Sequence, residues 1–337
     1  MSSEIDNLRS AAGEYSKDAL EARKKFIELR HEQDVEISSM LYRMADQVAD
    51  EIRKELSSLP SGASSLQLDY MEKLEKVLRQ EAEKLNIDMT KALQEYIERA
   101  VEGGSGFSRA VTVNLFDAAE IKNIQVDEMF YRLNRRVVDA CWQRTQKGLK
   151  LSDMIWQKGQ SFSNDITEIV RQSIVTGQDA VTTARTLERY VRQDTKTLVK
   201  DYPNLMKHLE GKVPDNLCYE SLRLVRSETT AAFGDATKAA AKITPSYKGI
   251  KWVLSKSHPL PDICNELASH NEGLGLGVYA PGNEPHFPAH PNDMCFLVPV
   301  HEQPEDFVKK LKQWTKNPES QPDIEKWYQD TYLTMLK

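Results

Sequence analysis

The sequence has no long apolar run. None approaches the roughly 18 residues that a membrane-spanning helix requires. The opening residues, Met-Ser-Ser-Glu-Ile-Asp, lack the basic and then apolar order of a signal peptide. Cysteine is also scarce, and the four cysteines are dispersed without the spacing of a secreted disulfide framework. These absences predict a protein made in a reducing cytoplasm, with no membrane partner.

Aromatic residues and positive charge are limited as well. Aromatics make up 8% of the 337 residues, and the mean hydropathy is -0.57. These values favour extended helical surface over a dense β core. The formal net charge of -6 excludes a protein that binds nucleic acid over its whole surface, although it leaves room for local basic patches. The length suits roughly two domains.

Helical periodicity dominates the chain up to about residue 243. Apolar residues recur at steps of three and four over 14–58 and again after residue 67, which predicts two long amphipathic helices that pack on other helices, in this chain or in a partner. The glycines of 103–106 predict a flexible break. Cys141 follows a helical apolar stripe and is predicted to be a buried structural thiol.

Metal-capable side chains gather near the C-terminus. Four of the seven histidines and two of the four cysteines lie between residues 257 and 295, among Pro and Gly and with few apolar residues for a core. Two apolar, strand-like runs, 251–254 and 296–300, bracket this stretch and are predicted to pair as a small sheet. The clustered residues are His258, Cys264, His270, His286, His290 and Cys295.

Together these patterns predict a mainly α protein. Long N-terminal helices and a helical core precede a small α+β module that contains the Cys/His residues, and a charged helical tail follows. The predicted organisation is a long amphipathic helical region at 1–102, a linker and helix at 103–147, a domain at 148–300 with the Cys/His module at 251–300, and the tail at 301–337.

The span 148–300 carries four motifs in a recognisable order, of which the fourth is the most specific. With these motifs the span resembles the phage head-morphogenesis family, the Mu F-like minor head proteins. The motifs are Gly148-Leu149-Lys150-Leu151-Ser152 with Ile155-Trp156, Gly177-Gln178-Asp179-Ala180 with the run from Ala184 to Tyr190, Arg226-Ser227-Glu228-Thr229, and His258-Pro259 with Asp262-Ile263-Cys264, Gly273 to Tyr279 and His290-Pro291.

This resemblance implies a minor capsid protein of the virion head, located near the portal vertex. It would assist head assembly and DNA packaging or ejection, with the portal protein, other capsid proteins and viral DNA as partners. The helices of 1–102 would then serve portal docking or self-association. The family often ends His-Pro-x-Cys-x-Cys, whereas this chain has Asp293 at the first cysteine position and keeps only Cys295.

The Cys/His residues have three interpretations. A structural zinc ion would take Cys264, His290 and Cys295, with His258 or Asp293 as the fourth ligand, because zinc prefers a tetrahedral set of thiolates and imidazoles. Alternatively, the cysteines are small buried hydrophobes and the histidines cap turns. The third is an enzyme, a metal-dependent nuclease or hydrolase that uses the same cluster. No Gly-x-Ser-x-Gly elbow supports catalysis, so we expect no enzymatic activity.

A basic stretch beside the cluster suggests contact with DNA. Lysines release counterions from phosphates and aromatic rings stack on bases. The alternative is an ordinary solvated face. The predicted contact residues are Lys248, Lys251, Trp252 and Lys256.

Overall fold

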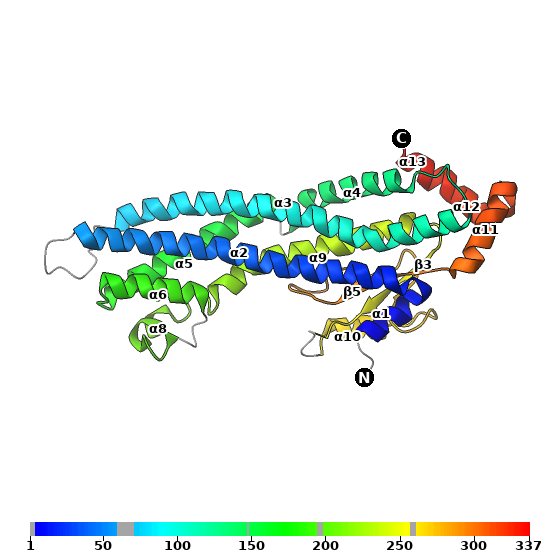
Figure 1. The fold of residues 1–337 in the computed structure, drawn as a ribbon. Helices are drawn as coiled ribbons and strands as arrows, with labels where there is room; N and C mark the ends of the chain where they lie inside the picture. Colours follow the sequence, from blue (N-terminus) through cyan, green and yellow to red (C-terminus); the bar gives the residue numbers. More distant parts are fainter. Residues whose placement is uncertain (1–3, 59–70, 147, 194–197, 257–260) are drawn as a thin grey trace. The chain divides into compact units, whose positions relative to one another are not determined.

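The computed structural model describes residues 4–58, 71–146, 148–193, 198–256 and 261–337, and it is mainly helical with a small antiparallel sheet near the C-terminus, as predicted (Figure 1). No helix in the described ranges is both long and apolar enough to cross a membrane. The helices are α1 (Glu4–Ala12), α2 (Ser16–Ser58), α3 (Met71–Ala118), α4 (Val126–Gln143), α5 (Leu151–Val175), α6 (Ala180–Arg192), α8 (Pro203–Leu209), α9 (Leu217–Ile243), α10 (Ile263–Ser269), α11 (Pro304–Lys316), α12 (Pro322–Trp327) and α13 (Leu333–Met335). The strands are β1 (Thr145–Gln146), β2 (Leu149–Lys150), β3 (Tyr247–Val253), β4 (Val278–Tyr279) and β5 (Phe296–His301).

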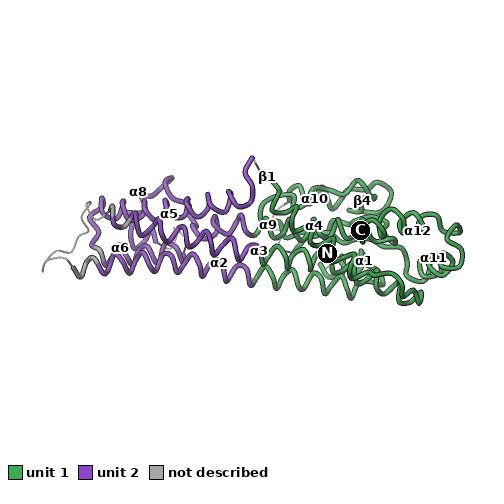
Figure 2. Tube along the Cα trace, turned by 90° about the horizontal axis from the view of Figure 1, so that it is seen from above, with its two compact units in different colours: residues 1–31, 95–144, 226–337 green, residues 32–94, 145–225 purple. Residues whose placement is uncertain are grey.

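The chain folds into two compact units. Unit 1 comprises residues 1–31, 95–144 and 226–337, and unit 2 comprises residues 32–94 and 145–225 (Figure 2). The ranges predicted from the sequence follow chain order, whereas each unit gathers segments that are distant in the sequence. The Cys/His module lies in unit 1.

Helix α2 confirms the long helix predicted over 14–58. Its apolar positions repeat every three or four residues, so one stripe of side chains is buried along the helix. The predicted terminator at Leu59-Pro60 lies outside the described residues. Buried members of the stripe include Phe26, Ile37, Leu41, Met44, Val48 and Ile52.

The flexible break predicted at 103–106 is wrong, because these residues lie inside α3. A Cβ atom on Gly104 would come within 2.2 Å of the carbonyl oxygen of Phe233 on α9. The Thr237 hydroxyl donates a hydrogen bond to the Gly104 carbonyl at 3.1 Å. Glycine therefore allows the backbones of α3 and α9 to approach closely, and the run reflects packing rather than flexibility.

The predicted pairing of 251–254 with 296–300 is confirmed. β3 is the central strand of a three-stranded sheet, with β4 on one side and β5 on the other, and both pairs are antiparallel. Trp252 lies opposite Leu297 in the β3–β5 register.

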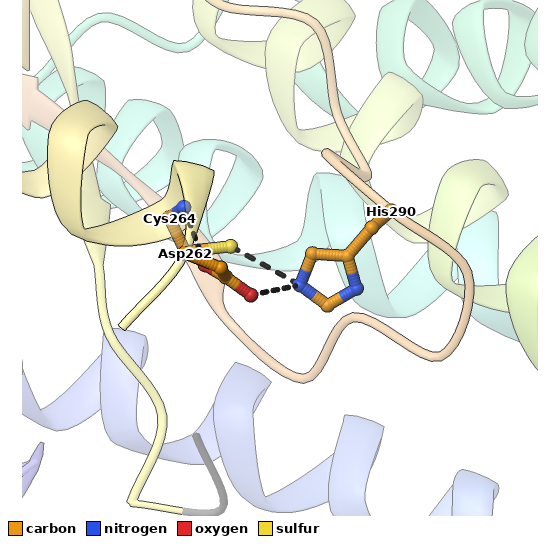
Figure 3. Close-up of side chains that lie close together, drawn as sticks. All are labelled: Asp262, Cys264 and His290. Carbon is orange, nitrogen blue, oxygen red and sulfur yellow. Dashed lines mark hydrogen bonds and ion pairs between the residues drawn. The ribbon is translucent and has the colours of Figure 1, made fainter. Parts of the chain in front are cut away.

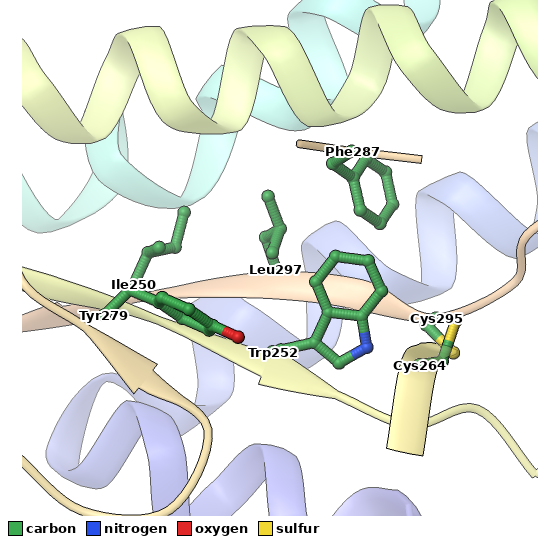
Figure 4. Close-up of a cluster of buried hydrophobic side chains, with 7 residues drawn as sticks. All are labelled: Ile250, Trp252, Cys264, Tyr279, Phe287, Cys295 and Leu297. Carbon is green, nitrogen blue, oxygen red and sulfur yellow. The ribbon is translucent and has the colours of Figure 1, made fainter. Parts of the chain in front are cut away.

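The module has a small apolar core, contrary to the expectation that it holds too few apolar residues (Figure 4). The flanking strands supply much of this core, and Phe287 extends it toward α9. A Cβ atom on Gly234 of α9 would lie 2.0 Å from the Phe287 ring, so glycine leaves the space that the ring fills. The core residues are Ile250, Trp252, Cys264, Tyr279, Phe287, Cys295 and Leu297.

The last residues pack back onto unit 1. The Trp327 indole N–H donates to the carbonyl of Ile243 at the end of α9 at 2.6 Å. The Tyr332 hydroxyl accepts a hydrogen bond from the backbone N–H of Gln125 at 2.8 Å. Both rings are buried, so this helical segment forms part of the core.

His301 at the end of β5 predicts a specific acid sensitivity. The ring is buried between Tyr15 and Phe107, 3.1 Å from the Ser246 hydroxyl, and burial lowers its pKa to about 3. An unfolded histidine gains its proton near pH 6.5. Above pH 6.5 the ring is neutral in both the folded and the unfolded protein, so His301 makes stability no more pH-dependent there. As the pH falls from 6.5 toward 3, only the unfolded protein gains this proton, and the free energy of unfolding decreases.

Between pH 7 and pH 5 we expect the wild type to lose about 2 kcal/mol more unfolding free energy than His301→Gln. Urea denaturation at both pH values measures the difference. Equal losses in the two proteins would mean that His301 does not cause the acid sensitivity.

Candidate metal centre

The site is assembled around the start of α10. Asp262 caps this helix: its carboxylate accepts a hydrogen bond from the backbone N–H of Cys264 at 2.7 Å. The cap fixes Cys264 in the first turn, with its thiol buried. The segment that precedes β5 brings His290, Asp293 and Cys295 to the same place.

One group of donors contains Asp262, Cys264 and His290 (Figure 3). The Cys264 sulfur lies 3.4 Å from Nε2 of His290, and an Asp262 carboxylate oxygen lies 3.2 Å from the same nitrogen. The side chains of His290 and Asp262 are 35% and 39% exposed, so this edge of the site reaches solvent.

A second group contains Cys264, Asp293 and Cys295, and all three are buried. The Cys264 sulfur lies 3.7 Å from Oδ2 of Asp293, and in both groups the donor atoms lie within 4.8 Å of one another. Cys264 therefore joins an outer edge, formed with Asp262 and His290, to an inner edge, formed with Asp293 and Cys295.

Hydrogen bonding around His290 favours a cation at Nε2. Nδ1 lies 3.0 Å from the carbonyl oxygen of Pro291, which only accepts hydrogen bonds. Nε2 faces the carboxylate of Asp262, a second acceptor. A neutral imidazole carries one proton, so one nitrogen would face an acceptor without a proton between them. A second proton on the ring, which would make an ion pair with Asp262, removes this conflict. A metal ion at Nε2, with Nδ1 protonated toward Pro291, also removes it, and such carbonyl contacts are typical of metal-bound histidines.

Asp293 also shapes the loop. Its Oδ2 accepts from the backbone N–H of Ala289 at 3.0 Å and its Oδ1 from the backbone N–H of Cys295 at 2.8 Å. These bonds fold 289–295 into a compact turn beside Cys264. Asp293 thus places a metal-capable oxygen next to the thiol of Cys264.

The thiols of this site are neutral unless a cation is present. Burial raises the pKa of Cys264, and the Asp293 carboxylate raises it further. Burial also raises the pKa of Cys295 to about 11. A divalent metal reverses this preference, because a coordinated thiol loses its proton.

The separation of Cys264 and His290 matches the spacing of two zinc ligands. Tetrahedral zinc, bound about 2.3 Å from sulfur and about 2.0 Å from nitrogen, holds those two atoms about 3.5 Å apart. The Cys264 sulfur and Nε2 of His290 are 3.4 Å apart. Of the predicted ligands, Cys264 and His290 lie in the outer group, while Cys264, Cys295 and Asp293 lie in the inner group, and neither group contains Cys264, His290 and Cys295 together. Asp262 of the outer group was not among the predicted ligands. The predicted ligand His258 lies outside the described residues.

Sequence reasoning missed Arg23 at this site. Its buried guanidinium, from α2, donates to the carbonyl of Met294 at 3.0 Å and lies over the ring of Phe296 at 4.1 Å. Glu4 of α1 pairs with it at 2.9 Å. Arg23 places positive charge beside Asp293 and Cys295. No local pattern signals this contact, because it joins opposite ends of the chain.

The predicted DNA contacts do not form one patch. Trp252 is 1% exposed inside the module core, so the prediction that it stacks on bases is wrong. Lys248 is paired with Glu302 at 3.0 Å. Lys251 is half-buried, and on β3 it points to the face opposite Trp252, whereas Lys256 is exposed.

The geometry of the outer edge differs from a catalytic Cys-His-acid relay. In a relay the thiol and the acid contact different nitrogens of the histidine. Here Cys264 and Asp262 both face Nε2 of His290. This convergence on one nitrogen suits a shared cation better than a proton transfer.

Other cysteines make ordinary structural contacts. Cys141 is buried, as predicted, and lies 3.7 Å from the Arg144 guanidinium. Cys218 donates to the carbonyl of Val191 at 2.8 Å.

Comparison of the chain with protein-family models, curated proteins and solved structures found no match.

Proposed function

We propose that this chain is a minor head protein of a phage, located near the portal vertex, which assists head assembly and DNA packaging or ejection. The motifs between Gly148 and Pro291 support this proposal. The observation that carries the proposal is the order of the four motifs along residues 148–300. The residue that follows the fourth motif contacts the third: the backbone N–H of Asn292 donates to the hydroxyl of Ser227 on α9 at 3.2 Å.

Within this function, the Cys/His module is held together by a structural zinc ion. The module has only a small core of its own, and a metal bound between α10 and the segment before β5 supplies folding free energy. The ion would be held by Cys264 with donors of the two groups, and His290 and Cys295, which belong to different groups, would have to move closer together to share it.

The partial exposure of Asp262 and His290 favours one second candidate, a metal-dependent nuclease or hydrolase. A catalytic zinc keeps one coordination position open to water, and an ion on the outer edge would reach solvent. Metal-loaded protein that cleaves DNA, and loses this activity in His290→Ala, would support the enzyme over the head protein.

The head-protein proposal predicts physical association with capsids. Chain produced in infected cells is expected to sediment with purified phage heads, in few copies per head. If the protein stays in the supernatant while fully assembled heads sediment without it, the proposal is contradicted.

Exposed apolar residues on α2 are the proposed portal-docking or self-association surface. Ile27 is 46% exposed and Val35 is 56% exposed. We expect Ile27→Asp with Val35→Asp to lower binding to purified portal at least tenfold, measured by co-sedimentation. Lys25→Asp, an exposed substitution on another side of the same helix, is the matched control. Deletion of residues 1–102 would not test this surface, because α2 and α3 contribute buried residues to both units.

A further inference from the structure

Two buried thiols lie side by side in unit 1. The sulfurs of Cys264 and Cys295 are within 4.8 Å of each other, and both cysteines are free. Figure 4 shows the two side chains meeting between the start of α10 and the start of β5. A disulfide needs its sulfurs about 2.0 Å apart, so a modest rotation of the side chains would join them.

We propose that Cys264 and Cys295 are a redox pair that closes to an intramolecular disulfide when the metal is absent and a peroxide is supplied. The same two sulfurs are proposed zinc ligands, so metal binding and the disulfide exclude each other. The formation of a disulfide in metal-free protein depends on the thiol geometry alone. The competition between zinc and the disulfide rests on the proposed zinc centre.

The oxidation is balanced with hydrogen peroxide as the oxidant. The Cys264 sulfur attacks one peroxide oxygen, so an S–O bond forms, the O–O bond breaks and one water leaves. The Cys295 sulfur then attacks the sulfenic sulfur of Cys264, so an S–S bond forms, the S–O bond breaks and a second water leaves. The two thiols lose two electrons and two protons, all of which end in the two waters.

Both thiols are buried, so peroxide reaches them only when side chains of the outer edge move. Cys264 is the thiol on that edge, where it lies against Asp262 and His290, whose side chains are more than a third exposed. Cys295 lies on the inner edge, next to the buried Asp293 and on the side of Arg23. The pair therefore has an outer thiol that can be oxidised and an inner thiol positioned to resolve the product.

The test uses the full chain, either stripped of metal with a chelator or loaded with zinc, and treated with hydrogen peroxide. In the stripped protein the titratable thiols, counted after denaturation, are expected to fall from four to two, because the chain has four cysteines. The intact mass should fall by about 2 Da, and peptide mapping should join Cys264 to Cys295. Zinc-loaded protein should react at least tenfold more slowly.

Matched variants identify the pair. In Cys295→Ser, Cys264 should gain oxygen instead of forming a disulfide, whereas Cys141→Ser should still lose about 2 Da. Oxygen added to Cys264 or Cys295 in the wild type, or a disulfide that involves Cys141 or Cys218, would overturn the inference.

The outcome is separable from that of the zinc centre. A disulfide in protein that binds no zinc would reject the metal proposal and support the redox pair. Bound zinc, with no disulfide after its removal, would support the metal and reject the redox pair.

Discussion

Protein purified without a histidine tag is expected to hold one zinc ion per chain, and Cys264→Ala is expected to lose it. Cys264 is the donor common to both groups at the site, so its removal breaks the outer and the inner edge together. We expect the variant to lose about 3 kcal/mol or more of unfolding free energy, because the metal supplies folding energy to the module. Elemental analysis by mass spectrometry measures the zinc, and urea denaturation measures the stability.

Cys218→Ala is the matched control, since Cys218 is also a buried thiol but its sulfur donates to the carbonyl of Val191 in unit 2. It should keep the zinc. Wild-type protein with well under one zinc per chain, and with stability unchanged by a chelator, would leave the cluster as a hydrogen-bonded module without metal.

Two further variants in the same experiment identify the fourth ligand. Asp262→Asn keeps a good helix cap while it removes the negative charge, because asparagine caps helices about as well as aspartate. Asp293→Asn removes the charge from the inner edge. Loss of a group that only hydrogen-bonds to a ligand costs about 10- to 100-fold in metal affinity, so the substitution that weakens zinc binding by more than about 100-fold marks the ligand.

Gly104→Ala is expected to destabilise the protein by about 3 kcal/mol, a large cost for one added methyl group. The added Cβ would lie 2.2 Å from a backbone oxygen of α9 and 3.0 Å from the Ala236 Cβ. A backbone atom cannot rotate away, so α3 and α9 must separate, which weakens the packing around Phe233 and Thr237. Urea denaturation measures the loss.

Gly106→Ala provides the matched control on the same helix. A Cβ on Gly106 meets nothing within 4 Å, and alanine is the better helix former by about 1 kcal/mol. This variant should be as stable as the wild type or slightly more stable. Equal effects at Gly104 and Gly106 would mean that close helix packing does not explain the glycine run.

The sequence by itself determined the elements whose signals are local. The periodicity of three and four residues predicts α2 because a helix repeats every 3.6 residues, and its buried stripe follows that repeat. The apolar runs at 251–254 and 296–300 predict β3 and β5 and their pairing. The concentration of cysteine and histidine between them marks the candidate site before any fold is known.

Only the tertiary structure decided what surrounds each side chain. The glycine-rich stretch around Gly104 suggests a flexible link, but in the structure Gly104 allows α9 to pack closely against α3. Trp252 beside lysines suggests a base-stacking ring, and the pleat of β3 turns it into the module core. Arg23 joins the site through a contact that no spacing in the sequence encodes, and the approach of His290 to Asp262 likewise depends on the fold. Local patterns follow from backbone geometry within a few residues, whereas ligand sets and close contacts depend on where distant segments meet.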